Sequence, residues 1–386
     1  MHIVFINYNK FEGNSGIHIH PLANELVQMG HEVTVYLPSE QSTKCSLNDK
    51  ALYTSRSFND ERMLHNQKGI IFISWTPREI VRKKTINLCT EYKAPYFVHL
   101  EDNEEQIIED SLNIPIEHLS LMEGPILDQM IPENISHPIY YKDFINGSNG
   151  VTCIINTLEE FVPKHIPAIS FWPACENEIY EITLDRNQQI RKDIGIEQDE
   201  YVIFYPGNIH TSNIRDVMEL YTAISILNKE NRKVKLIRTG QNYVNVDQYI
   251  DLNRPYYMEM GECPLSANIK YIAAADIVIQ PGKDNNFNHF RFPSKIPMFL
   301  ASGRPLILGN TNFGEYLTDW KNCVKFVNGD SEELVQKILL LLNAPKLAFE
   351  IGKKGRQFAL ENFSWHKSAR IFENFILSNI LTSHKI

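Results

Sequence analysis

The chain has 386 residues, more than one hydrophobic core usually serves, so two domains are expected. Its 43% hydrophobic and 22% charged residues are typical of a globular protein, and its net charge of -9 argues against broad nucleic-acid binding. The six cysteines lack metal-ligand or disulfide spacing, which favours reduced thiols and a cytoplasmic location. The start, MHIVFINYN, predicts a strand and not a signal peptide, and no apolar run predicts a membrane span.

The first half of the chain alternates short apolar runs with helical patterns. A buried-type strand at 2–7 is followed by a glycine loop at 12–16, a helix at 18–29 and a second strand at 32–37. This order predicts a βαβ unit and therefore a parallel sheet. Further elements are expected as strands at 69–74, 96–100 and 151–155 and as helices at 78–93 and 104–112.

The pattern breaks between Phe171 and Asp199, which we interpret as an interdomain connection with one short helix. It then restarts. We expect strands at 201–205, 233–239 and 276–280, a helix at 217–227, a helix that ends at 275, and a final amphipathic helix from 364 to 381. The chain is therefore predicted to be α/β, with two Rossmann-like doubly wound domains, at 1–174 and 175–363, that face each other across a cleft. Such sheets bind ligands at their carboxyl ends.

One stretch in the second half, FNHFRFPSKIPMFLASGRPLILGN, places cations where a helix should begin. Ser294 is a suitable N-cap and Gly303 a suitable stop, so a helix is expected at about 295–302. Arg291 and Lys295 flank its amino end, where free N–H groups favour an anion such as a diphosphate. The alternative is a capped helix with two solvated cations.

The same stretch resembles the donor segment of GT-B glycosyltransferases, particularly the retaining, sugar-nucleotide-dependent family 4, also called glycosyl transferases group 1. The likeness rests on Arg-x-Pro-x-Lys followed by LASGRPLI, on IAAADIVIQP at 272–281, on NFGE at 312–315, and on FSW at 363–365. The glycine loop and helix at 13–33 resemble the family's first loop. The resemblance implies that residues 364–386 form a helix that returns to the first domain.

Four positions depart from the family pattern. Phe290 and Met298 stand where the family usually carries two donor-site glutamates, and Asn208 and Asn213 stand where it carries an arginine and a lysine. Asparagine donates hydrogen bonds but supplies no charge to a diphosphate. The nearest replacement cations are His210, Arg215, Lys283, Arg291 and Lys295.

The resemblance and the residue types together give the candidate site. The expected catalytic residues are His99, Arg291 and Lys295; the expected donor-binding residues are Gly13, Asn14, Gly207, Asn208, Lys283, Ser294 and Glu315; and the expected acceptor-binding residues are His18, His20, Glu101 and Asp102. Each has a structural alternative. The carboxylates either orient an acceptor, serve as a base in an inverting variant, or cap the next helix. The histidines of the first helix either bind acceptor, act as a base, or face solvent.

The predicted function is glycosyl transfer from a nucleotide-diphosphate sugar, retaining and independent of metal, with no other cofactor. The acceptor is a saccharide such as a growing polysaccharide, a lipid-linked sugar, a small molecule or a protein, and the enzyme is a monomer or homodimer. The basic residues of the second helix either contact the inner membrane face or form a solvated surface; they are Arg78, Arg82, Lys83 and Lys84. The alternatives are a nucleotide-sugar epimerase that uses the carboxylates at 101–105, and a non-catalytic relative that binds a partner.

Overall fold

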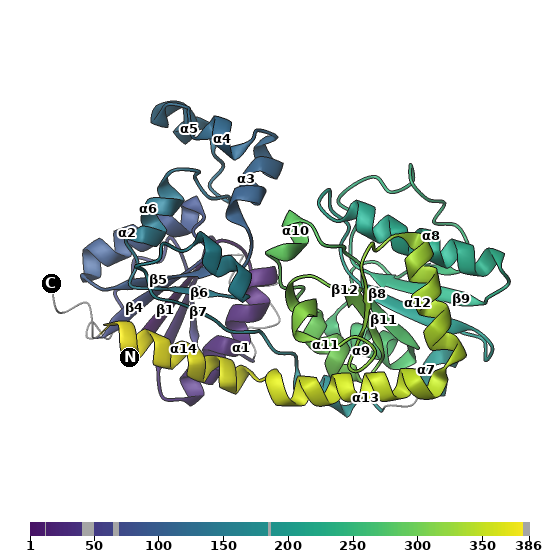
Figure 1. Cartoon of the computed structure of the whole chain (residues 1–386). Helices are drawn as coiled ribbons and strands as arrows, with labels where there is room; N and C mark the ends of the chain where they lie inside the picture. Colours follow the sequence, from purple (N-terminus) through teal and green to yellow (C-terminus); the bar gives the residue numbers. More distant parts are fainter. Residues whose placement is uncertain (12, 41–49, 65–68, 184–186, 381–386) are drawn as a thin grey trace. The chain divides into compact units, whose positions relative to one another are not determined.

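The computed structural model describes the chain except for residues 12, 41–49, 65–68, 184–186 and 381–386. Its compact parts are two units. The first comprises Met1–Pro173, Phe290–Phe292 and Trp365–Ile386, and the second comprises Ala174–His289 and Pro293–Ser364. Each unit has its own parallel sheet with helices on both faces (Figure 1).

The first unit is built on a parallel sheet of seven strands in the order β3-β2-β1-β4-β5-β6-β7. The two central strands are mostly apolar, and all their residues are buried, because helices cover both faces. Their register places Asn7 opposite Trp75 at the carboxyl edge. The strands are β1 (His2–Asn7), β2 (Glu32–Leu37), β3 (Thr54–Ser57), β4 (Ile70–Trp75), β5 (Tyr96–Leu100), β6 (Val151–Cys153) and β7 (Ala168–Ser170).

Helices on opposite faces of this sheet define two cores. Helix α1 and the C-terminal helix α14 pack over one face, where Phe5 stacks on Phe372 with ring centroids 5.9 Å apart. Helix α2 packs over the other face. Helices α4 and α5 project from the body of the unit (Figure 1). The helices are α1 (Asn14–Gln28), α2 (Glu79–Tyr92), α3 (Glu104–Leu112), α4 (Ile116–Leu119), α5 (Gly124–Met130), α6 (Tyr140–Asn146), the 3-10 helix Asn156–Phe161, and α14 (Trp365–Ile380).

The second unit repeats this arrangement with a parallel sheet in the order β10-β9-β8-β11-β12-β13. Helices α8 and α12 share one core with the sheet. The strands are β8 (Tyr201–Pro206), β9 (Val234–Thr239), β10 (Tyr257–Glu259), β11 (Ile277–Gln280), β12 (Leu306–Gly309) and β13 (Val324–Phe326). The helices are α7 (Gln188–Asp193), α8 (Ile214–Lys229), α9 (Leu265–Ala274), α10 (Asn286–His289), α11 (Ile296–Ser302), α12 (Ser331–Asn343) and α13 (Pro345–Asn362), with 3-10 helices at Asn177–Glu181 and Asn312–Tyr316.

The predicted strands and helices are present, with their ends moved by a few residues, but one expected cap is wrong. Lys295, not Ser294, occupies the N-cap position of α11, and no side chain caps this helix. Ser294 is exposed. The backbone explains the shift, because the turn Pro293–Ile296 closes with a hydrogen bond from the Ile296 N–H to the Pro293 carbonyl at 3.0 Å.

An ion pair with little solvent exposure stabilises the amino edge of the second sheet. Asp276, just before β11, accepts the Val202 N–H at 2.7 Å and a guanidinium N–H of Arg191 at 3.1 Å. Arg191 also donates to the Ala274 carbonyl at 2.8 Å and is only 2% exposed. Two central strands and helix α7 are thereby held together by one ion pair.

Replacing Arg191 with methionine should therefore destabilise the second unit. Removing one partner of a buried pair leaves the other charge without compensation, which costs about 3–5 kcal/mol. We expect a clearly lower urea midpoint for Arg191→Met in equilibrium unfolding. Arg232→Met, at an exposed position, is the matched control and should change the midpoint little. Equal midpoints for both variants would contradict this role of Arg191.

Candidate functional site

Each sheet reverses its strand order once, and the reversal marks the expected ligand position. In the first unit the reversal lies between β1 and β4, and in the second it lies between β8 and β11. The connections leave these neighbouring strands toward opposite faces, so a crevice opens at their carboxyl ends. Most of the candidate residues lie along these two edges.

At the second edge, Gly207 follows β8 because a side chain has no room there. A Cβ atom on Gly207 would lie 2.6 Å from the hydroxyl oxygen of Tyr205. Gly240, at the end of β9, has a φ of +109° and packs against the Gly207 backbone, where a Cβ would lie 2.7 Å from the Gly207 carbonyl carbon. The backbones of Gly207 and Gly240 therefore pack directly against each other and against the Tyr205 side chain, and neither position has room for a side chain.

The side chain of Lys295 supplies a positive charge at this carboxyl edge. Its ammonium nitrogen lies 5.2 Å from the ring centroid of Tyr205, within range of a cation–π contact. The structure therefore places the Lys295 ammonium over Tyr205, two residues before Gly207, and its role in the chemistry remains a prediction. Arg291 precedes it by four residues, within the segment Phe290–Phe292. The start of α11 offers fewer free N–H donors to an anion than expected, because Pro297 has no N–H and the Ile296 N–H is already hydrogen-bonded.

The two asparagines at the family's cation positions brace the loop after β8. Asn208 accepts the Gln241 N–H at 2.8 Å through its side chain. Asn213 accepts the His210 N–H at 2.8 Å and donates to the Asn208 carbonyl at 3.0 Å. Both side chains are therefore engaged in shaping the loop.

Lys283 and Glu315 follow β11 and β12 at the same edge, and both side chains are exposed. Lys283 lines a cavity of about 580 Å³ together with Arg215 on α8 and residues before α12. Three carboxylates share that lining: Asp216, Glu219 and Asp330. The cavity therefore has no excess of positive charge that would select a diphosphate.

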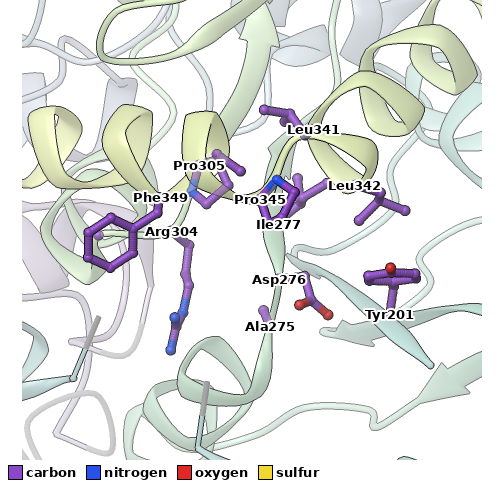
Figure 2. Close-up of a pocket in the computed structure, with 12 residues that line it drawn as sticks. Tyr201, Ala275, Asp276, Ile277, Arg304, Pro305, Leu341, Leu342, Pro345 and Phe349 are labelled. Carbon is purple, nitrogen blue, oxygen red and sulfur yellow. The ribbon is translucent and has the colours of Figure 1, made fainter. Parts of the chain in front are cut away.

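A second cavity of the same unit lies at the opposite edge of the sheet. It has a volume of about 230 Å³, and Tyr201, Asp276 and Arg304 contribute to its lining (Figure 2). Both charged groups serve the fold: Asp276 holds Arg191, and Arg304 donates to the Ile272 and Ala273 carbonyls at 3.2 and 2.8 Å. Since parallel sheets bind ligands at their carboxyl edge, this cavity is not the donor site.

In the first unit, Glu101 is the centre of a buried polar network. It follows β5 and accepts hydrogen bonds from the Ser15 hydroxyl and from Nδ1 of His18, the latter at 2.7 Å. Burial opposes its ionisation, but the hydrogen bonds from His18 and Ser15 outweigh this and lower the pKa of Glu101 to about 2. Glu101 is therefore a carboxylate at neutral pH that fixes the His18 ring.

His99 lies inside β5 and is fully buried. Its Nδ1 lies 2.8 Å from the Thr152 hydroxyl, and its ring stacks on Trp75 at a centroid distance of 3.9 Å. Burial lowers the pKa of His99 to about 3, so the imidazole is neutral at physiological pH. The side chain belongs to the floor of the crevice, and its catalytic role remains a prediction.

Arg78 lies at the same edge of the sheet, at the N-cap position of α2. Its guanidinium lies 3.8 Å from the ring centroid of Tyr8, and its Nε lies 3.6 Å from a carboxylate oxygen of Glu104. The Ser136 hydroxyl donates to the same carboxylate at 2.6 Å. Burial raises the pKa of Asp102, while Arg78 opposes this shift. The sequence pattern groups Arg78 with three surface cations, but the side chain is buried; the only sequence sign of this is that Arg78 comes three residues after the end of the buried strand β4.

The other three basic residues of α2 also have partners within the first unit. Arg82 donates to Glu79 at 2.6 Å, Lys83 to Glu133 at 3.1 Å, and Lys84 to the Phe58 carbonyl at 2.7 Å. The helix therefore does not present the four free cations that a membrane contact was expected to use. In the part of the chain that the structure describes, no helix is long and apolar enough to cross a membrane.

The remaining candidates of the first unit do not all share one site. Nδ1 of His20 lies 2.7 Å from the Tyr53 hydroxyl, whereas His18 contacts Glu101. Two residues along a helix turn the side chain by about 200°, so these histidines point in different directions. Gly13 is the N-cap of α1, which begins at Asn14; the side chain of Asn14 lies outside the described residues.

Comparison with known proteins agrees with this architecture. Residues 200–344 match the family model described as Glycosyl transferases group 1. An uncharacterized glycosyltransferase of Methanocaldococcus jannaschii is 20% identical over 266 residues, which is 68% of each chain. A crystal structure of Anabaena HepE in complex with UDP and glucose aligns with a TM-score of 0.71 at 10% identity, over 97% of this chain and 99% of that one.

A second solved structure has the same fold. Sucrose-phosphate synthase from Thermosynechococcus elongatus aligns with a TM-score of 0.71 at 12% identity, over 99% of this chain and all of the other. The chain has the GT-B fold. The predicted fold class is thereby confirmed, and the second unit carries the glycosyltransferase family match.

The depressed pKa of His99 makes stability depend on pH. Below about pH 6.5 the unfolded chain binds a proton at this residue, whereas the folded protein does so only near pH 3, so stability falls as the pH is lowered between these values. The slope from this residue is at most about 1.4 kcal/mol per pH unit. We expect His99→Asn, which can keep a bond to Thr152, to lose less stability than the parent between pH 6.5 and 5 in urea unfolding.

His165→Asn, at an exposed position, is the matched control for this measurement. Its stability should follow the parent's pH dependence. A parent-like slope in His99→Asn would show that His99 is protonated in the folded protein.

Proposed function

We propose that this chain is a GT-B glycosyltransferase that transfers a hexose from a nucleotide-diphosphate sugar, with UDP as the nucleotide. The observation that carries the proposal is that the family-matched segment, 200–344, contains the carboxyl edge of the second sheet, where the Lys295 ammonium lies over the ring of Tyr205, two residues before Gly207. The Anabaena HepE structures with UDP and with UDP-glucose support the choice of UDP, since their fold covers nearly this whole chain.

The chemistry follows from the leaving group. Breaking the bond between sugar and diphosphate leaves negative charge on the diphosphate, and fixed donors and cations stabilise that charge in the transition state. Lys295 supplies an ammonium at the edge, where it lies over the ring of Tyr205. Arg291 supplies a second cation in the same donor segment. The acceptor is assigned to the first unit.

UDP binding tests this assignment directly. The variant Arg291→Ala plus Lys295→Ala should weaken UDP affinity at least 100-fold in isothermal titration calorimetry, because each hydrogen bond to a charged group contributes about 1.5–3 kcal/mol and 1.4 kcal/mol is tenfold. Lys321→Ala, an exposed lysine elsewhere in the same unit, should bind UDP like the parent. Parent-like UDP binding by the double variant would refute the donor site.

A panel of nucleotides, measured by thermal shift, separates an enzyme from a non-catalytic relative. Bound nucleotide raises the free energy of unfolding by about 2.7 kcal/mol at 100 times its Kd, which a thermal shift detects. Failure of UDP, GDP, ADP, CMP and dTDP alike to shift the unfolding temperature would favour the non-catalytic alternative.

We also propose that transfer proceeds with retention and without a metal ion. Retention is supported by the resemblance of the donor segment, and metal independence by the two cations that the segment itself supplies. With UDP-glucose as donor, the proton NMR spectrum of the first product should show the same anomeric configuration as the donor, and EDTA should leave the initial rate unchanged. A product of opposite configuration, or a rate abolished by EDTA and restored by Mg²⁺ or Mn²⁺, would overturn the corresponding part.

A further inference from the structure

The part of the first unit between α2 and α6 is strongly acidic. From Ala94 to Tyr141 the sequence contains ten aspartates and glutamates and no lysine or arginine. Helices α4 and α5 belong to this stretch and stand out from the body of the unit (Figure 1). Residues 113–131, which include both helices and the turn between them, are called the projection below. They lie outside the family-matched residues 200–344, so the glycosyltransferase match does not account for them.

The projection also exposes apolar side chains. It contains nine isoleucine, leucine and methionine residues, of which only Leu119, Leu127 and Ile131 are buried. Leu121 is 84% exposed, the largest exposed fraction of any large apolar side chain that the structure describes, and Ile126 is 51% exposed. A single exposed apolar residue is ordinary, but several in a short segment that stands out from the body indicate an interaction surface.

Hydrogen bonds at its base hold the projection in place. On the outgoing side, the Glu109 carboxylate accepts the Ile116 N–H at 2.8 Å. On the returning side, the Ile80 N–H in the first turn of α2 donates to the Glu133 carbonyl at 2.9 Å. A surface that is fixed before binding loses less conformational entropy when a partner docks, so this anchoring favours recognition.

Unpaired carboxylates flank the most exposed leucine. Glu117 lies four positions before Leu121, and Glu123 lies two positions after it. Both glutamate side chains are exposed, and neither carboxylate has an ion-pair or hydrogen-bond partner within the described residues. Nearer the base, by contrast, Glu133 pairs with Lys83 at 3.1 Å. An apolar side chain between two unpaired negative charges complements a surface that is apolar and positively charged.

The charge of the projection decides among its possible occupants. A bilayer with anionic lipids attracts clusters of lysine and arginine, and the projection contains neither. Nucleic acid is repelled for the same reason. A second copy of the chain carries a net charge of -9, so two copies repel each other. A protein that presents basic residues around an apolar patch matches both features of the surface.

We propose that the projection docks a basic, apolar segment of another protein. Leu121 and Ile126 are the apolar anchors, and Glu117 and Glu123 are the charges that orient the partner. A helix with lysine or arginine on one side and leucine or isoleucine on the other has the required chemistry. The inference is independent of the donor site, because every residue it uses belongs to the first unit.

The test measures binding of the full chain to a fluorescein-labelled peptide of leucine and lysine, about five helical turns long, with its leucines along one side. A second peptide has the same composition in an order that scatters the leucines around the helix. Fluorescence anisotropy is recorded at about 0.15 M salt, where long-range attraction between charges is screened. We expect the first peptide to bind at least tenfold more tightly than the second. Equal affinities, or no binding of the first peptide, would overturn the proposal.

Apolar variants locate the contact. Leu121→Ser plus Ile126→Ser should weaken binding of the first peptide at least tenfold, because both anchors are lost. Leu52→Ser plus Ile86→Ser removes two exposed apolar residues elsewhere in the same unit and should bind like the parent. All four positions are exposed, so the fold should be kept, and thermal unfolding of each variant checks this. Parent-like binding by the first variant would place the contact elsewhere and refute the proposal.

Charge variants test the second feature of the surface. Glu117→Gln plus Glu123→Gln should weaken the first peptide and make its affinity less sensitive to salt, since two charges of the interface are lost. Glu61→Gln plus Glu91→Gln changes the net charge equally at exposed positions outside the projection and should match the parent. Equal affinities for the two variants would show that only net charge attracts the peptide, and this would also overturn the proposal.

Two further measurements examine the other occupants. Sedimentation velocity reports self-association of the chain, and flotation with vesicles of phosphatidylcholine and phosphatidylserine reports lipid binding. We expect the variant Leu121→Ser plus Ile126→Ser to match the parent in both measurements. Loss of self-association in this variant would assign the projection to a second copy, and loss of vesicle binding would assign it to lipid; either result would contradict a protein partner.

Discussion

The carboxylate of Glu101 is the interaction on which the first unit's site depends. An ionised carboxyl group inside a protein is costly unless donors surround it, and here the donors come from Ser15 and His18 on α1. The bonds join the start of α1 to the end of β5, which are far apart in the sequence. A glycine makes this possible: a Cβ atom on Gly16 would collide with the Phe11 carbonyl, so the chain can turn into α1 at this point only without a side chain.

The two edges of the sheets use polar groups differently. At the amino edge of the second sheet, Arg191, Asp276 and Arg304 find partners in the backbone or in one another. At the carboxyl edge of the first sheet, polar atoms of His18, Thr76 and His99 remain without partners in the described part of the chain. The charged groups at the amino edge are therefore satisfied within the fold, whereas the buried groups at the carboxyl edge of the first sheet each cost about 1–3 kcal/mol.

The sequence predicted the central strands well, because burial on both faces gives apolar runs without alternation, such as Ile3–Ile6 in β1. It did not predict the edge strands. The residues of β3 are Thr-Ser-Arg-Ser, and those of β7 are only half-buried, so neither carries an apolar pattern. Their strand structure comes from pairing with a neighbour already in place, which is tertiary context that a local pattern does not contain.

The positions of candidate residues that follow a strand could be predicted from the sequence, since they lie at a carboxyl edge; Gly207, Glu101 and Asp102 are examples, and their roles remain predictions. The sequence did not predict which side chains these residues contact. The network of Glu101 with Ser15 spans 86 positions of sequence, and Arg78 looked like the first of four surface cations. The cap of α11 was also wrong, because the turn at Pro293 satisfies the Ile296 amide before a serine side chain is needed.

The asparagines at 208 and 213 fix the shape of the loop after β8, at the positions where the resembled family carries an arginine and a lysine. Both side chains hold the loop after β8 through hydrogen bonds of 2.8–3.0 Å, and the Arg238 guanidinium adds a bond of 3.0 Å to the Gly207 carbonyl. A loop braced in this way presents its backbone in a fixed geometry, which lowers the reorganisation that binding a ligand requires. Positive charge must then come from outside the loop, and Lys295, resting on Tyr205 beside Gly207, is the residue that the second unit places there.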